Sequence, residues 1–153
     1  YYLWVDASCA LTRGNEVNLW LETLGDADIA LFKHPERNSI SEEYEFIKQK
    51  LADGNKYLVS RYQHEWLDAQ YDYIAREMIG FPASNLYAST AFIYKPSNRI
   101  EAAFGEVWIQ KTRFHLHDQL ALAYALQVFN INVRVISGNY QTSGYMEFVR
   151  NKK

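Results

Sequence analysis

Apolar stretches typical of β-strands alternate with helical periodicity along most of this 153-residue chain. The strand pattern occurs over 2–6, 28–33, 86–94 and 133–136. Apolar residues at spacings of three and four predict helices over 17–24, 39–53, 65–79, 98–112 and 118–129. Because strands that alternate with helices usually form βαβ units, we expect an α/β fold with a mostly parallel sheet and helices on both faces.

The chain is expected to fold as a single domain, 1–153. Its length and its 48% hydrophobic content suffice for one core, and no repeat, linker or low-complexity tract divides it. Residues 138–153 are polar and interrupted by glycine, so we expect them to form a polar tail.

Charge and cysteine content argue against several classes of partner and location. The net charge is −2 and the 16 basic residues are scattered, which disfavours nucleic-acid binding. The sequence predicts neither a transmembrane segment nor a signal peptide, because no apolar run is long enough and the apolar start has no basic leader. Cys9 is the only cysteine, which precludes an intrachain disulfide and leads us to expect a cytoplasmic protein.

Aromatic residues are abundant, at 16% of the chain with 12 Tyr and 4 Trp. Their flat apolar faces and polar edges are suited to stacking on a sugar or a nucleobase. The commoner explanation is a packed core with tyrosines at its rim. Trp66 and Trp108 keep the apolar spacing of their predicted helices, which favours packing for those two.

The first predicted strand ends on a carboxylate, in the order Asp6-Ala7-Ser8. Open α/β sheets bind ligands at the carboxyl ends of their strands, where Asp6 could hold a divalent cation or a ribose hydroxyl. Ser8 stands where a second carboxylate would strengthen a metal site. The alternative is that Asp6 only caps the following turn.

A second group of polar residues follows the second predicted strand, where His34-Pro35-Glu36-Arg37 precedes Glu43. Arg37 could grip a phosphate or carboxylate with two parallel hydrogen bonds, and His34 could donate to a diphosphate or a sugar hydroxyl. The alternative is that Arg37 pairs with Glu43 and holds the loop. In a parallel sheet, the loops would gather Asp6, His34, Arg37 and Ser97 at one edge.

A third group opens the helix 118–129, in the order His115-Leu116-His117-Asp118-Gln119. Asp118 and Gln119 present polar tips at the start of an otherwise apolar helix, so Asp118 could act as a general base toward a sugar hydroxyl. The alternative is that Asp118 only interacts with the helix dipole. Two histidines are too few ligands for a structural zinc site.

These three groups, in this order, resemble a glycosyltransferase-like family of GT-A architecture that includes plant mucilage-related proteins of pectin synthesis and bacterial and phage relatives. The matching motifs are W-x-D at Trp4–Asp6, H-P-x-R at His34–Arg37 with the acidic Glu43 six positions on, and D-Q-L at Asp118–Leu120. The resemblance covers roughly residues 2–129. No serine-hydrolase elbow, Walker loop, dinucleotide-binding glycine motif or H-E-x-x-H occurs.

The resemblance implies a nucleotide-sugar donor and transfer of its sugar to a hydroxyl of a glycan or other acceptor. Asp118 would be catalytic, and Asp6 would hold a Mn or Mg ion. Substrate contacts would come from five further residues: Ser8, His34, Arg37, Glu43 and Gln119. The family's nucleotide-binding strands precede the W-x-D strand, and this chain begins inside that strand without an initiator Met, so we expect it to be the C-terminal part of a longer enzyme.

Two alternatives stay open. A degenerate transferase fold could bind glycans or a partner without turnover, which Ser8 at the second position of the D-x-D pattern would favour. A strand-end Asp6 with Thr12 downstream also resembles the phosphatases of the haloacid-dehalogenase type. Those enzymes need a second Asp two residues after the first, and Ser8 occupies that position.

Overall fold

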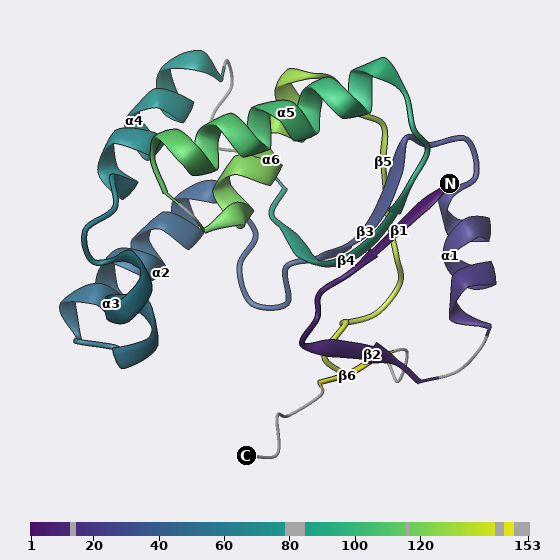
Figure 1. Ribbon diagram of the computed structural model, residues 1–153, viewed down its shortest axis with the longest axis horizontal. Coiled ribbons are helices and arrows are strands. Elements are labelled where there is room, and N and C mark those ends of the chain that lie inside the picture. Colours follow the sequence, from purple (N-terminus) through teal and green to yellow (C-terminus); the bar gives the residue numbers. More distant parts are fainter. Residues whose placement is uncertain (13–14, 79–84, 116, 143–145, 149–153) are drawn as a thin grey trace.

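The computed structural model describes residues 1–12, 15–78, 85–115, 117–142 and 146–148. A central four-stranded sheet has the spatial order β1 (Tyr2–Val5), β4 (Tyr87–Tyr94), β3 (Ile29–Lys33) and β5 (Val133–Val135) (Figure 1). A separate pair consists of β2 (Cys9–Leu11) and β6 (Met146–Phe148). The helices of the described residues are α1 (Glu16–Leu24), α2 (Ile40–Ala52), α3 (Lys56–Tyr62), α4 (Leu67–Glu77), α5 (Asn98–Arg113) and α6 (Asp118–Val128).

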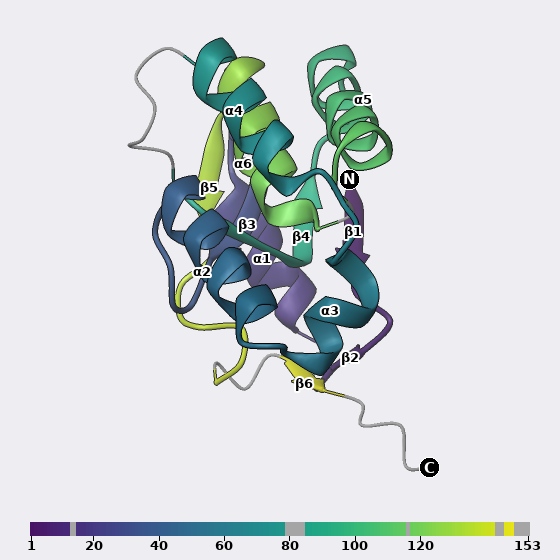
Figure 2. The ribbon, with the colours of Figure 1, turned by 90° about the vertical axis from the view of Figure 1, so that its left-hand side faces the viewer.

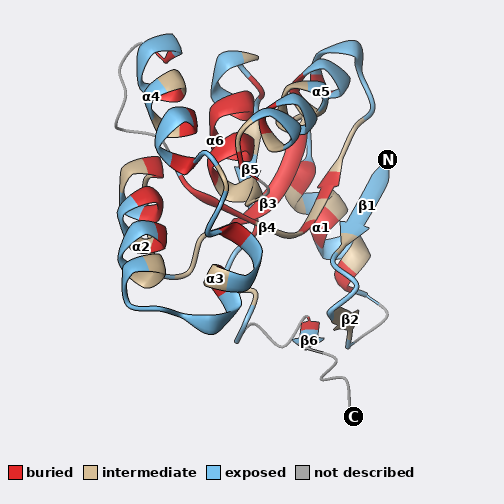
Figure 3. Cartoon of the chain, turned by 60° about the vertical axis from the view of Figure 1, so that its left-hand side comes forward, coloured by how far each residue is buried: buried red, intermediate tan, exposed pale blue. Residues whose placement is uncertain are grey.

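Helices cover both faces of the main sheet, which confirms the predicted α/β class. Alternate residues of β3 point to opposite faces. Phe32 packs with Trp20 of α1 on one face, whereas Leu31 packs with Ile100 of α5 and Leu122 of α6 on the other. In Figure 3 the buried residues concentrate in β3 and α6, which lie at the centre of the molecule.

The prediction of a mostly parallel sheet is wrong. Strand β4 runs antiparallel to both of its neighbours, β1 and β3, and the only parallel pair among the described strands is β3 with β5. The sheet is therefore mixed, and the polar loops are distributed differently from the expected arrangement.

Strand β4 runs opposite to β3 because the helices that connect the two strands include an antiparallel pair. The Tyr44 hydroxyl donates to Asp68 at 2.8 Å, and Ser41 Oγ lies 3.1 Å from the Tyr71 hydroxyl, so α2 and α4 run antiparallel. Figure 2 shows these two helices beside each other, with α3 at their turn. A single crossover helix carries the chain to the opposite end of the sheet, but a helix pair returns it to the end it left, so the next strand runs in the opposite direction.

Serine side chains cap the starts of two helices. The Glu42 N–H donates to Ser39 Oγ at 3.1 Å at the start of α2, and the Ile100 N–H donates to Ser97 Oγ at 3.2 Å at the start of α5. Helix α6 has no side-chain cap, and its segment 120–126 is buried throughout. Burial on all sides therefore stabilises α6, which explains why its sequence is apolar all round.

The polar tail expected over 138–153 is wrong for residues 146–148, which form β6 and pair with β2. Met146 belongs to the core cluster beneath α1. Residues 143–145 and 149–153 lie outside the described part, as does residue 79 at the end of the predicted helix 65–79. The short elements β2, β6 and α3 were not predicted. No helix in the described segments has the length and apolar character needed to span a membrane.

Candidate functional site

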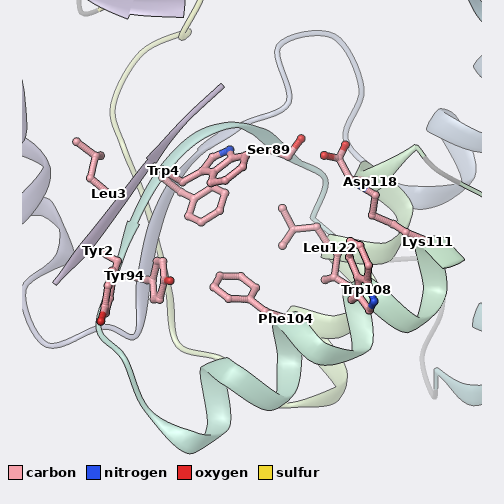
Figure 4. Close-up of a pocket in the computed structure, with 12 residues that line it drawn as sticks. Tyr2, Leu3, Trp4, Ser89, Tyr94, Phe104, Trp108, Lys111, Asp118 and Leu122 are labelled. Atoms are coloured by element: carbon pink, nitrogen blue, oxygen red, sulfur yellow. The ribbon is translucent and has the colours of Figure 1, made fainter. Parts of the chain in front are cut away.

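An open pocket of about 470 Å³ lies between the strands β1 and β4 and the helices α5 and α6 (Figure 4). We call it the aromatic cleft. Six aromatic rings line it: Tyr2, Trp4, Phe92, Tyr94, Phe104 and Trp108. Its polar lining residues are Ser89, Lys111 and Asp118. The cleft thus combines flat apolar surfaces with a small number of charged and hydroxyl groups, as ligand sites commonly do.

Strand register positions the rings of the cleft. Tyr2 is paired with Tyr94 and Trp4 with Phe92 across the β1–β4 ladder, and both pairs are stacked, with ring centroids 5.5 and 6.2 Å apart. Trp4 is nevertheless 54% exposed, and Trp108 of α5 is 69% exposed. These two indoles therefore offer large apolar faces that packing within the chain does not use.

Asp118 lies at one end of the cleft. It is the first residue of α6, and no hydrogen bond or ion pair to its side chain occurs among the described residues. In Figure 4 its carboxylate lies at the same end as the Ser89 hydroxyl, while Tyr2 and Tyr94 lie at the other end. A carboxylate in this position is available to a ligand, and it also interacts favourably with the α6 dipole.

A second polar group, which we call the Arg37 cluster, consists of His34, Arg37, Glu43 and His117. The Arg37 Nε donates to the Glu43 carboxylate, and its Nη1 donates to Glu36 at 2.8 Å. Its guanidinium also lies 3.8 Å above the centre of the Phe46 ring. The side chains of Arg37 and Glu43 are 14% and 1% exposed. The predicted Arg37–Glu43 pair is confirmed, and it occupies the groups proposed to grip a phosphate.

The two histidines complete this cluster. His34 Nδ1 accepts hydrogen bonds from the backbone N–H groups of Glu36 and Arg37, at 3.3 and 3.1 Å, and so fixes the loop. His117 Nε2 lies 3.6 Å from Glu43 Oε1. Burial, followed by the positive charge of Arg37, lowers the pKa of each histidine to about 4. Both imidazoles are therefore neutral near pH 7.

Glu43 connects the Arg37 cluster to the cleft electrostatically. Burial raises the pKa of the Glu43 carboxyl, Arg37 opposes this effect, and the charge of Asp118 adds to the rise. The direct contact is made by His117, the residue before Asp118, whose Nε2 lies 3.6 Å from Glu43 Oε1. The structure therefore brings together residues of the second and third predicted groups, from α2 and α6.

Asp6 stands apart from these groups. Its backbone N–H donates to the Thr90 carbonyl at 2.8 Å, and its carboxylate accepts the Ser8 N–H at 2.7 Å. Hydrogen bonds from the Ser8 side chain and backbone hold the pKa of the Asp6 carboxyl below its usual value. Asp6 therefore caps the following turn, and both Asp6 and Ser8 are exposed.

The gathering of strand-end residues at one edge is confirmed in part. The Asp6 N–H bonds to Thr90 and the His34 N–H bonds to Leu86, so β1 and β3 end at the same edge, where β4 begins. Thr90 and Leu86 are four residues apart, which corresponds to roughly 13 Å along a strand. Ser97 follows the far end of β4 and lies at the opposite edge, so its predicted place was wrong.

No group of three or more His, Cys, Asp or Glu that could hold a metal ion occurs among the described residues. A Mn or Mg ion at Asp6 would therefore need oxygens from a bound ligand, as Mg commonly takes from phosphates. The side-chain oxygen of Gln119 is buried and has no hydrogen-bond partner within the described residues.

Sequence reasoning missed Trp108, Lys111 and Ser89 as site residues. Trp108 was assigned to a packed helix face, but it lines the open cleft. A usable signal was present: Phe104 and Trp108 are four residues apart on a helix, and Tyr2 and Trp4 share one face of a strand. Two such aromatic stripes on adjacent elements are suited to forming a cleft.

Comparison of the chain with protein-family models, curated proteins and solved structures found no significant match. The resemblance to glycosyltransferases therefore depends on the three motifs, and function has to be argued from the geometry.

Proposed function

We propose that this protein is a glycosyltransferase, which moves a sugar from a nucleotide-sugar donor to a hydroxyl of a glycan or other acceptor in the aromatic cleft. The observation that carries the proposal is the position of Asp118, a carboxylate without a partner in the described chain, beside exposed indole faces. Sugar rings have flat apolar faces that stack on indoles, and their hydroxyls need polar partners. Trp4 and Trp108 would supply the stacking surfaces. The polar partners would be Ser89, Lys111 and Asp118.

In the proposed reaction, the Asp118 carboxylate accepts the proton of the acceptor hydroxyl. The hydroxyl oxygen forms a bond to the anomeric carbon, the bond from that carbon to the donor phosphate breaks, and the nucleoside diphosphate leaves with the electron pair. A positioned carboxylate is suited to this general-base role. This scheme inverts the anomeric centre. In a retaining reaction, Asp118 would instead orient the sugar.

The leaving diphosphate needs positive charge. Lys111 lines the cleft and can supply it. Asp6, with Ser8 beside it, would hold a Mn or Mg ion that neutralises the diphosphate when bound. Arg37 and Glu43 bond to each other, so we assign them and His34 a positioning role in place of a direct donor contact. Gln119, whose oxygen has no partner among the described residues, remains a candidate for a substrate contact.

The substitution Asp118→Asn tests the proposal. Transfer would be assayed with a panel of UDP- and GDP-sugars and Mn, on glycan acceptors. We expect transfer to fall by about a hundred- to ten-thousandfold, while the thermal unfolding curve stays unchanged. Glu22→Gln is the matched control, because Glu22 is an exposed carboxylate on α1, which packs on the other face of the sheet. Undiminished transfer by Asp118→Asn would remove Asp118 from catalysis.

A second candidate is a glycan-binding module without turnover. It is favoured by Ser8 at the second position of the D-x-D pattern and by the bond between the Asp6 carboxylate and the Ser8 N–H. The aromatic cleft would serve this function equally well. Binding of glycans with no thermal stabilisation by any nucleotide-sugar would support this candidate over the transferase.

A further inference from the structure

We infer that the acceptor is an extended glycan chain, which runs from the aromatic cleft past the end of α5 to Trp66. This inference rests on the proposed function and adds to it the length and path of the substrate. It assigns a binding role to Trp66, which lies outside the cleft.

The path consists of three adjoining hollows. The aromatic cleft adjoins a hollow of about 380 Å³, and Lys111 lines both. Glu65 and Trp66 line that second hollow and also a third, of about 460 Å³, which extends toward α2 and α4. Each hollow thus shares at least one lining residue with the next. A ligand longer than one sugar could therefore occupy them in succession.

The backbone holds Trp66 where its side chain could contact the part of a glycan that extends beyond the aromatic cleft. Its backbone N–H donates to the Phe114 carbonyl at 3.0 Å, just after the end of α5, while its side chain is 67% exposed. Trp108 lies on α5 six residues before Phe114, which is roughly 9 Å along a helix axis. Trp108 thus lies on α5 inside the cleft, and Trp66 is hydrogen-bonded to the residue that follows α5.

The chemistry of the path fits a carbohydrate better than a nucleic acid. Exposed indoles alternate along it with polar groups, namely Asp118 and Lys111 in the cleft and Glu65 beside Trp66. Sugar chains present the same alternation of apolar ring faces and hydroxyls. A nucleic acid would require a concentration of positive charge that a chain of net charge −2 with scattered basic residues does not provide.

Trp66→Ala is the informative substitution, because it removes only the exposed side chain and leaves the backbone bond to Phe114. Tyr57→Ala is the matched control: Tyr57 is an exposed aromatic residue on α3 that lines none of the three hollows. Affinities would be measured by calorimetry for oligosaccharide ladders of glucan, xylan, chitin and galacturonan, from the disaccharide upward. Binding of UDP- and GDP-sugars would be measured in parallel.

For the native chain, affinity should rise with oligosaccharide length and then level off. In Trp66→Ala the affinity for long oligosaccharides should fall by about fivefold to tenfold, while the affinity for the disaccharide stays unchanged. In Tyr57→Ala the rise of affinity with length should be the same as in the native chain. Equal affinity for short and long members, or an unchanged gain in Trp66→Ala, would overturn the extended path.

The parallel measurement separates this inference from the proposed function. If nucleotide-sugars bind but no oligosaccharide of the panel does, the extended glycan acceptor is wrong and the transferase proposal survives. If neither class of ligand binds, the proposed function fails, and the inference fails with it.

Discussion

The aromatic cleft and the Arg37 cluster are neighbours with opposite properties. In the Arg37 cluster Glu43 is buried, Arg37 is mostly buried, and the two side chains bond to each other. In the aromatic cleft, Trp4 and Trp108 are exposed, and Asp118 has no partner among the described residues. The Arg37 cluster, whose motif stands out in the sequence, therefore maintains the structure, whereas the aromatic cleft is available to a ligand.

The substitution Glu43→Gln should have the largest effect on stability. It removes the buried charge that compensates Arg37 and leaves the exposed Glu36 as the acidic partner of that guanidinium. Breaking the buried half of an ion-pair network is strongly destabilising. We expect a loss of about 3 kcal/mol in the free energy of unfolding, measured by urea denaturation. Glu45→Gln, an exposed carboxylate on the same helix, should change little.

The double substitution Arg37→Met with Glu43→Leu sharpens this result. Two apolar side chains remove both charges together, so much of the stability lost in Glu43→Gln should return. A loss below about 0.5 kcal/mol in Glu43→Gln, the range of ordinary surface substitutions, would contradict the structural role assigned to the Arg37 cluster.

Acidification should weaken the fold through the buried histidines. Burial lowers the pKa of His115 and His117 to about 4, whereas an unfolded histidine titrates near 6.5. Below pH 6.5 the unfolded chain binds protons that the native chain does not, so stability falls as the pH drops from about 6.5 to 4. Each histidine should account for about 1–2 kcal/mol at pH 5.

This pH dependence is measured by urea denaturation across the range. Replacing His115 and His117 together by Gln should make the profile less steep, and His34, whose pKa is also lowered to about 4, should account for part of the remaining slope. The double variant should be less stable at pH 7. His64→Gln is the control, because His64 is exposed. A profile that keeps its slope in the double variant would show that these histidines are not its source.

The substitution Trp108→Ala should separate binding from stability in the cleft. Because the indole is mostly exposed, we expect a stability change of at most about 0.5 kcal/mol. The loss of one stacking surface should weaken ligand binding by about tenfold, as measured by calorimetry with the best nucleotide-sugar of the panel. A stability loss of several kcal/mol would place Trp108 in the core and undermine the comparison.

The smallest expected effect belongs to Asp6→Asn. Its side chain is exposed, so thermal stability without ligand should change little. If Asp6 holds a cation against the diphosphate, the extra stabilisation that Mn gives in the presence of a nucleotide-sugar should disappear. If Mn still gives the full extra stabilisation in Asp6→Asn, residues other than Asp6 hold the cation.

Local signals predicted local structure well. The apolar strands, the helix predicted over 39–53 and the pairing of Arg37 with Glu43 all depend on residues close in sequence, and the structure confirms them. Strand direction was mispredicted because it depends on how α2 packs against α4, and periodicity within each helix does not contain that information. The β2–β6 pair was missed because two short strands from opposite ends of the chain form it.

In the candidate site, too, the sequence predicted local features and missed those that depend on tertiary packing. Asp118 was identified from its position at a helix start, which is a local feature. Trp66 and Trp108 were assigned to packed faces because helical spacing alone does not show which face of a helix lacks a partner. Their exposure results from the relative placement of α4, α5 and β1, which only the tertiary structure provides.

Heteronuclear NMR of the indole N–H signals of the four tryptophans, during titration with UDP- and GDP-sugars, shows whether the aromatic cleft binds a donor. Trp20 of α1 is fully buried against the other face of the sheet and is an internal control. We predict that the signals of Trp4 and Trp108 shift with saturation while that of Trp20 stays in place. Titrations in which Trp4 and Trp108 do not move with any donor sugar would contradict the account.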